Sequence, residues 1–372
     1  MEEQDGETNE SAALMLSIID RYIIKKFLST FFFMSGIIMM FAIVFDVSEK
    51  LGDFISNQAP LEKIIFDYYV NFIILYGNMF TSMIVFLSVI WFTTIMAKDT
   101  EIIPIWFSGK PLSRYLRPYF ISATILMLFS LGINHFLVPR ANKVRLAFEE
   151  QYYRDAMIVR DYHAEFPNNV SVYFSNYNTS DGRVNDFTFQ KWSENRKPKF
   201  FLKTRYALNE PNSKNWVLHD FYEKQFYPDS ISIRHVKELD TTFDFSISDM
   251  AQRENTAETM TYSELKSFIS RERMKGSAFV PLYEIELHQR TSYPFAAYIL
   301  TLIGVSVASQ KRRGGVGVNI AIGLGVVFVY IFAMKMLTVA ALNVGFPPLL
   351  SVWIPNLFFA IAAVFLFRYS QK

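Results

Sequence analysis

One short segment between two apolar runs carries the residues best suited to bind another protein. A carboxylate, an apolar and aromatic patch, and a glycine follow one another there: Glu101, Ile102, Ile105, Trp106, Phe107 and Gly109. A carboxylate in a helix's first turn is favoured by the helix dipole, and a glycine ends a helix readily. The pattern predicts either a coupling helix that inserts into a soluble cytoplasmic motor or an interfacial helix whose rings lie among lipid headgroups.

A second set of side chains combines charge with apolar bulk near the ends of apolar runs. Glu49 and Lys50 follow the first apolar run, and Lys335 lies near the end of the fifth. An ionisable group at a membrane span indicates function by default, although Lys335 can snorkel to the headgroups and Glu49 can simply pair with Lys50. Phe33 and Met40 belong to the Phe- and Met-rich first run, where ordinary lipid-facing packing is the simplest interpretation.

Several chemistries have no residues to support them. The chain has no cysteine, which excludes disulfides and thiolate catalysis, and its net charge of +2 gives no field for nucleic acid. His163, His219 and His235 are not spaced as metal ligands on one element. The glycine-rich run 314–317 lacks the Lys-Ser/Thr of a phosphate-binding loop. We therefore expect no catalytic residue, metal or cofactor, and any ATP hydrolysis must come from a partner.

The elements that position these residues are six apolar runs, three on each side of a polar stretch. Each is about as long as the roughly 20 residues that a helix needs to cross a bilayer. Inside lipid the backbone must satisfy its own hydrogen bonds, which predicts helices. The runs are 27–45, 68–96, 119–138, 291–310, 316–334 and 346–367.

The lysines and arginines near these runs gather on one side if the runs alternate in direction. By the positive-inside rule that side is cytoplasmic, so both termini are expected in the cytoplasm and residues 139–280 outside. The residues that set this bias are Arg21, Lys25, Lys26, Lys98, Lys110, Arg114, Arg117, Lys311, Arg312, Arg313, Arg368 and Lys372.

The polar stretch has the pattern of an antiparallel β domain. Short alternating runs separated by turn residues predict a sandwich or an open barrel. These runs are 170–177, 184–192, 200–208, 216–226, 231–236 and 241–247, with Asp181-Gly182 as a hairpin turn. The period then changes to that of a helix over 262–274, with Thr261 and Glu264 as a capping box and Gly276 as the stop.

Three small residues in the fifth run fall at helical spacing. Gly317, Ala321 and Gly325 lie at i, i+4 and i+8, which favours close contact with another helix. The partner is either a helix of a second permease or a helix of the same bundle.

The order of several motifs resembles the LptF/LptG (YjgP/YjgQ) family of lipopolysaccharide-export permeases, and LptG more than LptF. The resemblance covers the chain from about residue 16 to its end. The matching segments are Ile19-Asp20-Arg21-Tyr22-Ile23, Ala97 to Gly109, Leu287-His288-Gln289-Arg290 with Pro294, Arg313 to Gly325, and Gly345-Phe346-Pro347-Pro348 with Pro355.

The resemblance implies the inner-membrane permease of an ABC exporter for lipopolysaccharide, with a jellyroll-like periplasmic domain. Its implied partners are two copies of an LptB-like ATPase, a second LptF/LptG-type permease, and LptC-like and LptA-like bridge proteins. Glu101 falls on the family's coupling glutamate. The amphiphilic, anionic lipid that the resemblance implies as substrate makes five residues candidates for its contacts, namely Lys50, Glu49, Lys335, Phe33 and Met40. The family also carries lysines at the outer end of helix 1, and one of these positions falls at or near Asp46 here, which leaves Lys50 as the nearest cation.

The predicted organisation follows. It comprises a disordered acidic tail over 1–15, helices 1–3 over 16–138 with a coupling helix at about 98–108, a β domain over 139–260, a helical connector over 261–290, and helices 4–6 over 291–372. A permease for another lipid or lipoprotein and a non-transporting anchor that presents the β domain are the alternatives. An anchor would need no motor-docking helix.

Overall fold

The computed structural model of the chain describes residues 17–102, 104, 112–155, 157–210, 213–247, 250, 253–309 and 315–370. The predicted tail over 1–15 lies outside these ranges. The chain folds into two compact units. One comprises residues 1–148 and 284–372, and the other comprises residues 149–283. Six helices within the described ranges are long and apolar enough to cross a membrane, three before and three after an antiparallel sheet. The predicted fold class is thereby confirmed.

The first span, α2 (Ile18–Ser56), is one uninterrupted helix of 39 residues. It starts at a capping box, in which the Asp20 N–H donates to Ser17 Oγ and the Ser17 N–H donates to Asp20 Oδ2. Its buried side chains lie mostly near its amino end, at Asp20, Ile23, Phe27 and Phe31. The predicted run 27–45 is therefore only the middle of α2, because polar residues at each end extend the same helix.

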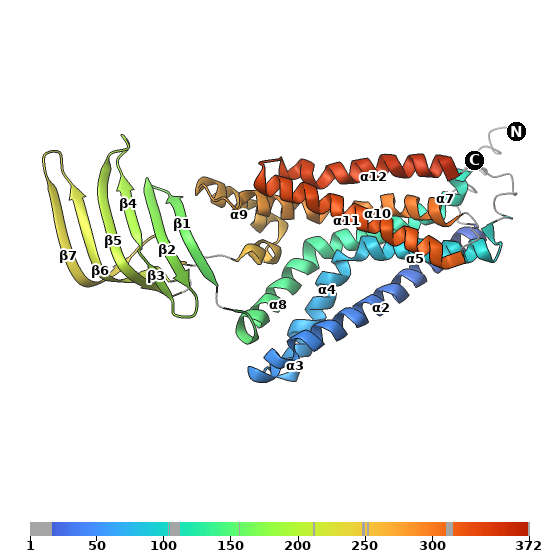
Figure 1. Ribbon diagram of the computed structural model, residues 1–372, viewed down its shortest axis with the longest axis horizontal. Coiled ribbons are helices and arrows are strands. Elements are labelled where there is room, and N and C mark those ends of the chain that lie inside the picture. The colour runs from blue at the N-terminus through green and yellow to red at the C-terminus, as the bar shows by residue number, and fades with distance from the viewer. Residues whose placement is uncertain are drawn as a thin grey trace, which may run out of the picture. The chain divides into compact units, whose positions relative to one another are not determined.

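The second predicted span is two helices rather than one. The chain turns back through α3 (Leu61–Lys63), the π-helical segment η1 (Ile64–Tyr69) and α4 (Val70–Met79), and Figure 1 shows α3 at the turn between α2 and α4. Phe80, with ψ near 0°, separates α4 from α5 (Thr81–Lys98). Gly77 and Asn78 are weak helix formers just before this break.

The third span runs past its predicted end at residue 138. It consists of α7 (Leu112–Gly132), η2 (Ile133–Leu137) and α8 (Val138–Tyr152). Charges in α8 mask its hydropathy, but its buried residues keep a helical spacing on one face. These residues are Val138, Ala141, Asn142, Arg145, Leu146, Phe148, Glu149 and Tyr152. The strands begin only at Ile158.

A proline inside α10 (Val280–Ala308) creates a polar junction between helices. Pro294 has no N–H for the carbonyl of Arg290, and Asn134 Nδ2 donates to that oxygen instead, at 3.0 Å. Ser82 Oγ donates to the Tyr293 carbonyl at 2.8 Å, and Asn356 Nδ2 donates to the Ser292 carbonyl at 3.3 Å. The remaining spans, α11 (Gly315–Asn343) and α12 (Pro348–Ser370), complete this unit.

The second unit holds one seven-stranded antiparallel sheet among its described residues. The strand order is β1-β2-β3-β5-β6-β7, and β4 continues the position of β3 by pairing with β2 and β5 (Figure 1). The strands are β1 (Ile158–Phe166), β2 (Val170–Asn178), β3 (Arg183–Asn185), β4 (Thr188–Trp192), β5 (Pro198–Asn209), β6 (Asn215–Phe226) and β7 (Ile231–Thr242).

A single row of residues interrupts the ladder across this sheet, with one member on each of β1, β2, β5, β6 and β7 and one between β3 and β4. The row consists of Asp161, Ser175, Asp186, Arg205, Asp220 and Lys237, each of which lies opposite the next in register but is not paired with it. The three aspartates have φ of 50°, 50° and 56°. Along each strand every second side chain is buried, and at the row this alternation shifts by one residue, as it does at a β-bulge. The same face of the sheet is therefore buried before and after the row.

The buried face of the sheet is covered in part by the segment that follows β7. Phe243, Phe245 and Ile247 cross it, and Trp216 Nε1 donates to the Phe245 carbonyl at 3.1 Å. The Ile247 N–H donates to Asn209 Oδ1 rather than to a strand. The predicted strand over 241–247 is therefore correct only for Thr241 and Thr242, which end β7. It is wrong for 243–247, where Phe243, Phe245 and Ile247 pack on the sheet without ladder pairing.

The helix after the sheet confirms its predicted boundaries. After η4 (Glu254–Thr259), α9 (Tyr262–Met274) begins where the Thr261 N–H donates to Glu264 Oε2 at 2.8 Å. It ends at Met274, and Gly276 two residues later stops it with a φ of +70°, a conformation that glycine adopts without strain.

Candidate functional site

A sharp helix end sets the position of Glu101. After α5 ends at Lys98, Thr100 adopts φ of +61°, the Glu101 N–H donates to the Met96 carbonyl at 2.9 Å, and the Thr100 N–H donates to the Ala97 carbonyl at 3.3 Å. This is the Schellman pattern, with Thr100 at the position where glycine is usual. Glu101 is thus presented by a fixed turn, and Ile102 and Pro104 are the described helical residues beyond it.

The Glu101 carboxylate is held by two side chains of α2. The Tyr22 hydroxyl donates to both of its oxygens, at 3.2 and 3.1 Å, and Lys26 Nζ lies 3.3 Å from Oε2. Lys26 also donates to the Tyr22 hydroxyl at 2.7 Å. The Glu101 side chain is still 36% exposed. A second cation can therefore approach this carboxylate from solvent.

A second ion pair joins α2 to the start of α7. Arg114 Nη2 lies 2.7 Å from Oδ2 of Asp20, whose side chain is only 4% exposed. The same Asp20 oxygen accepts from the Ser17 N–H. We call Asp20, Tyr22, Lys26, Glu101 and Arg114 the loop cluster, because its last two members flank the segment 103–111.

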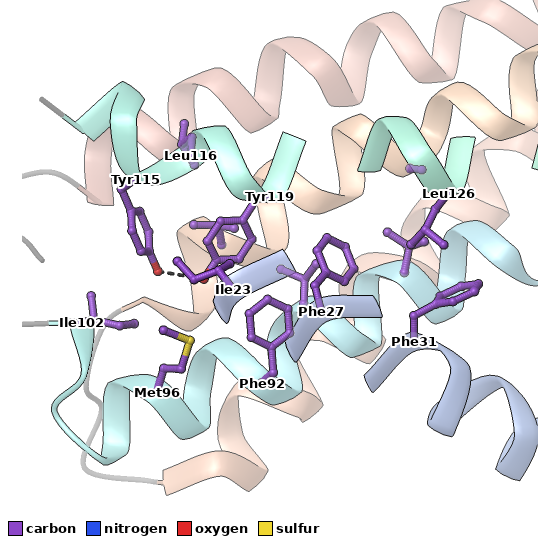
Figure 2. Close-up of a cluster of buried hydrophobic side chains, with 14 of the residues drawn as sticks. Ile23, Phe27, Phe31, Phe92, Met96, Ile102, Tyr115, Leu116, Tyr119 and Leu126 are labelled. Carbon is purple, nitrogen blue, oxygen red and sulfur yellow. Dashed lines mark hydrogen bonds between the residues drawn. The ribbon is translucent and has the colours of Figure 1, made fainter. Parts of the chain in front are cut away.

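Apolar packing fixes Ile102, the residue that precedes that segment. Ile102 is 2% exposed and belongs to a core cluster with Ile23, Met96 and Tyr115 (Figure 2). In the same cluster the Tyr115 and Tyr119 hydroxyls are hydrogen-bonded at 2.9 Å. Ile102 therefore anchors the turn at Glu101 to the bundle in this structure.

The remaining coupling residues of the sequence prediction, Ile105, Trp106, Phe107 and Gly109, lie outside the described residues, and their role stays a prediction.

The other end of α2 carries a compact polar group, the far-end cluster of Asp46, Lys50, Tyr68 and Tyr69. Lys50 Nζ lies 2.7 Å from Asp46 Oδ1, one helical turn away, and also bonds to the Tyr68 hydroxyl. Tyr68 and Tyr69, both from η1, donate to the two Asp46 oxygens at 3.2 Å. The Lys50 charge is therefore compensated by Asp46, while the neighbouring Glu49 is exposed.

The other predicted lipid-contacting residues are open at the surface of this unit. Phe33 and Met40 are 63% and 56% exposed on α2. Lys335 is exposed near the end of α11 and forms no ion pair within the part of the chain that the structure describes. The structure does not bring Lys335 into the far-end cluster.

The small-residue stripe points away from the chain's own helices. Gly317, Ala321 and Gly325 are exposed, and a Cβ on either glycine would meet no atom within 4 Å. On the opposite face, a Cβ at Gly323 would lie 2.3 Å from Ile90 Cδ1. Close packing inside this chain therefore uses Gly323 of α11 and leaves the predicted stripe without a partner among the described residues.

Sequence reasoning missed four members of the loop cluster. In the sequence, Asp20 and Tyr22 stand out only as part of the family-like segment 19–23. Lys26 and Arg114 stand out only as positive charges that orient the helices. The spacing Ser17-x-x-Asp20 is a detectable capping signal, but the Asp20–Arg114 and Lys26–Glu101 pairs join residues far apart in sequence.

No other group in the described residues offers a clear site. None of them assembles three or more metal-ligating side chains. A cavity of about 970 Å³ in the second unit is lined by Arg196, Arg271 and Lys275, but also by Glu165, Glu194 and Asp244, so its charge selects no ligand class.

The six apolar helices and the inserted antiparallel sheet define a multi-pass membrane protein with three spans on each side of a β domain. The family model described as lipopolysaccharide export system permease LptF/LptG matches residues 21–369, nearly the whole chain, and the chain belongs to this family. No curated protein matches it.

Membership confirms the resemblance inferred from the motifs. The chain is a lipopolysaccharide-export permease, and this family is one of transport permeases rather than enzymes. It is a multi-pass protein of the inner membrane. The family model covers LptF and LptG together, so the assignment to the LptG side stays a prediction.

Proposed function

We propose that the chain is the translocating subunit of an ABC exporter that extracts lipopolysaccharide from the inner membrane and passes it to a periplasmic bridge. A separate cytoplasmic ATPase, LptB-like and present in two copies, supplies the energy. In this arrangement both termini and the segment 103–111 are cytoplasmic, and the β unit is periplasmic.

The observation that carries the proposal is the setting of Glu101. Its carboxylate stands on a fixed turn, bound by Tyr22 and Lys26 yet more than a third exposed. Because this carboxylate is already ordered, it can accept a charge-assisted hydrogen bond from a cation of another protein with little further loss of side-chain entropy. An ATPase that docks at this turn supplies such a cation.

The far-end cluster supplies the lipid contact in this proposal. Lys50 offers an ammonium group near the phosphates of an anionic lipid, but Asp46 already shares it. The headgroup must therefore compete with Asp46 for Lys50, while Phe33, Met40 and Lys335 border the apolar chains and their headgroups. Glu49 adds negative charge beside this site and disfavours a second phosphate.

The stripe of Gly317, Ala321 and Gly325 supports a second LptF/LptG-type permease as its partner. Because the stripe has no partner among the described residues of this chain, a helix of that permease can approach it closely. LptC-like and LptA-like bridge proteins are then expected to meet the β unit.

Gentle extraction and purification, with mass spectrometry of the bound proteins and lipids, tests this function. We expect wild type to bring down an ABC ATPase and lipopolysaccharide. Glu101→Ala should reduce the bound ATPase about tenfold or more, since a charge-assisted hydrogen bond contributes about 1.5–3 kcal/mol. Asp99→Ala removes a neighbouring exposed carboxylate and should leave the ATPase within about twofold of wild type.

Absence of both ATPase and lipopolysaccharide from the wild-type preparation would contradict the proposal and favour an anchor that presents the β unit. An ATPase together with a different lipid would retain the permease and replace its substrate.

A further inference from the structure

The loop cluster ties α2 to both flanks of one segment. Within the first three turns of α2, Asp20 bonds to Arg114, which follows segment 103–111. Tyr22 and Lys26 in the same turns bond to Glu101, which precedes that segment. Any rotation or shift of this end of α2 therefore acts on both flanks together.

We call the ion pairs Asp20–Arg114 and Lys26–Glu101 the two ties. They differ in exposure to solvent and therefore in strength. Asp20 is almost fully buried and accepts at 2.7 Å, so separating it from Arg114 would leave a charge in an apolar surrounding. Lys26 and Glu101 are 26% and 36% exposed and lie 3.3 Å apart, so water can replace either partner at little cost. The first tie is fixed, and the second can exchange.

α2 is long and uninterrupted, so a movement at one end can be transmitted to the other. It has 39 residues and no internal proline, which at 1.5 Å per residue gives roughly 58 Å. By contrast α7, α10 and α12 each contain a proline. Only 17% of its most apolar stretch is buried in this chain. Its amino end is held by Ile23, Phe27 and Phe31, and its other end is held where Phe54 packs on Tyr68 and Phe148.

We infer that Asp20, Tyr22 and Lys26 are positioning residues that transmit movement between α2, the turn at Glu101 and the start of α7 at Arg114. The Asp20–Arg114 pair makes α2 and α7 move together. When Glu101 binds a cation of the ATPase, that cation replaces Tyr22 and Lys26 as its partner. The inference rests on the proposed function for the second partner of Glu101, but the ties themselves belong to this chain alone.

A distance measurement on the full-length chain tests the ties without any partner. The chain has no cysteine, so Arg21→Cys and Pro104→Cys can carry a single pair of spin labels. We expect a narrow distance distribution that broadens in Lys26→Met and in the double variant Asp20→Asn, Arg114→Met. The double variant avoids leaving Asp20 buried without its cation. Lys25→Met, an exposed neighbour with no ion pair among the described residues, is the control and should leave the distribution unchanged.

The second readout is lipid exported per ATP hydrolysed, measured in vesicles with the co-purifying ATPase. We expect this ratio to fall about fivefold or more in Lys26→Met and in the double variant, with the ATPase still bound, because a coupling of this size is typical between linked sites. Lys26→Arg should restore the ratio, which a general loss of structure would not allow.

Unchanged distance distributions, an unchanged ratio, or a change in only one of the two readouts would overturn the inference. If wild type binds no ATPase, the proposed function fails by itself, and the distance measurement still decides whether the ties position the segment.

Discussion

The two ends of α2 use ion pairs in opposite ways. At the amino end, Asp20 and Lys26 pair with residues 94 and 75 positions away, so their charges join separate segments. At the other end, Lys50 pairs with Asp46 of the same helix and both are enclosed by η1 tyrosines. Long-range pairs fix the relative position of segments, whereas a local pair mainly sets the charge that a surface presents. In the proposed function, the amino end of α2 serves the ATPase and the other end serves the lipid.

The largest effect on stability is expected from Arg114→Met. This change leaves Asp20 buried without its cation and should lower the free energy of unfolding by about 3 kcal/mol, toward the lower end for broken buried pairs because Arg114 is 26% exposed. Thermal unfolding in detergent measures it.

The double variant Asp20→Asn, Arg114→Met should lose less than Arg114→Met alone, since asparagine can still cap the Ser17 N–H. A double variant that loses as much as the sum of the two single changes would show that the two residues do not interact.

At the far end, the two members of the local pair should act in opposite directions on bound lipid. Lys50→Met removes the ammonium group and should reduce co-purified lipopolysaccharide about fivefold. This is less than the loss expected for an uncompensated charge-assisted contact, because Asp46 already shares the ammonium group. Asp46→Asn removes the competitor and should increase it by about twofold.

Quantitative lipid mass spectrometry on matched amounts of protein provides this comparison. Equal changes in both variants would mean that the pair is only structural. A rise in Glu49→Gln alone would move the lipid contact away from Lys50.

The smallest effect concerns the two turns that end α5 and α9. Both are Schellman turns, but one has Thr100 and the other Gly276 in the left-handed conformation. Thr100→Gly should raise the free energy of unfolding by about 1 kcal/mol, and Gly276→Ala should lower it by about the same amount. Thermal unfolding of the two variants measures both signs.

Most of the membrane architecture could be predicted from the sequence because lipid imposes a simple length and composition on each span. The errors fall where polar residues take part in a helix. The amphipathic α8 was assigned to the β domain because its charges hide a stripe through Ala141, Arg145 and Phe148. The break at Phe80 has only weak local signals.

The β unit shows what alternation alone cannot resolve. The apolar alternation of β1 does not predict a strand, because Asp161 interrupts it. The segment after β7 resembles a strand because Phe243, Phe245 and Ile247 alternate in sequence. In the site, Glu101 could be found from its motif, but its partners could not. Tyr22, Lys26 and the Asp20–Arg114 pair depend on helix packing across the bundle, which no local pattern encodes.

The central claim, that one end of α2 serves the motor and the other the lipid, is tested most directly by one preparation of two variants. Bound ATPase and bound lipopolysaccharide are quantified together for Glu101→Ala and Lys50→Met. We predict that Glu101→Ala loses the ATPase and keeps the lipid, while Lys50→Met keeps the ATPase and loses lipid. Loss of both components in either variant, or of neither in both, would contradict the account.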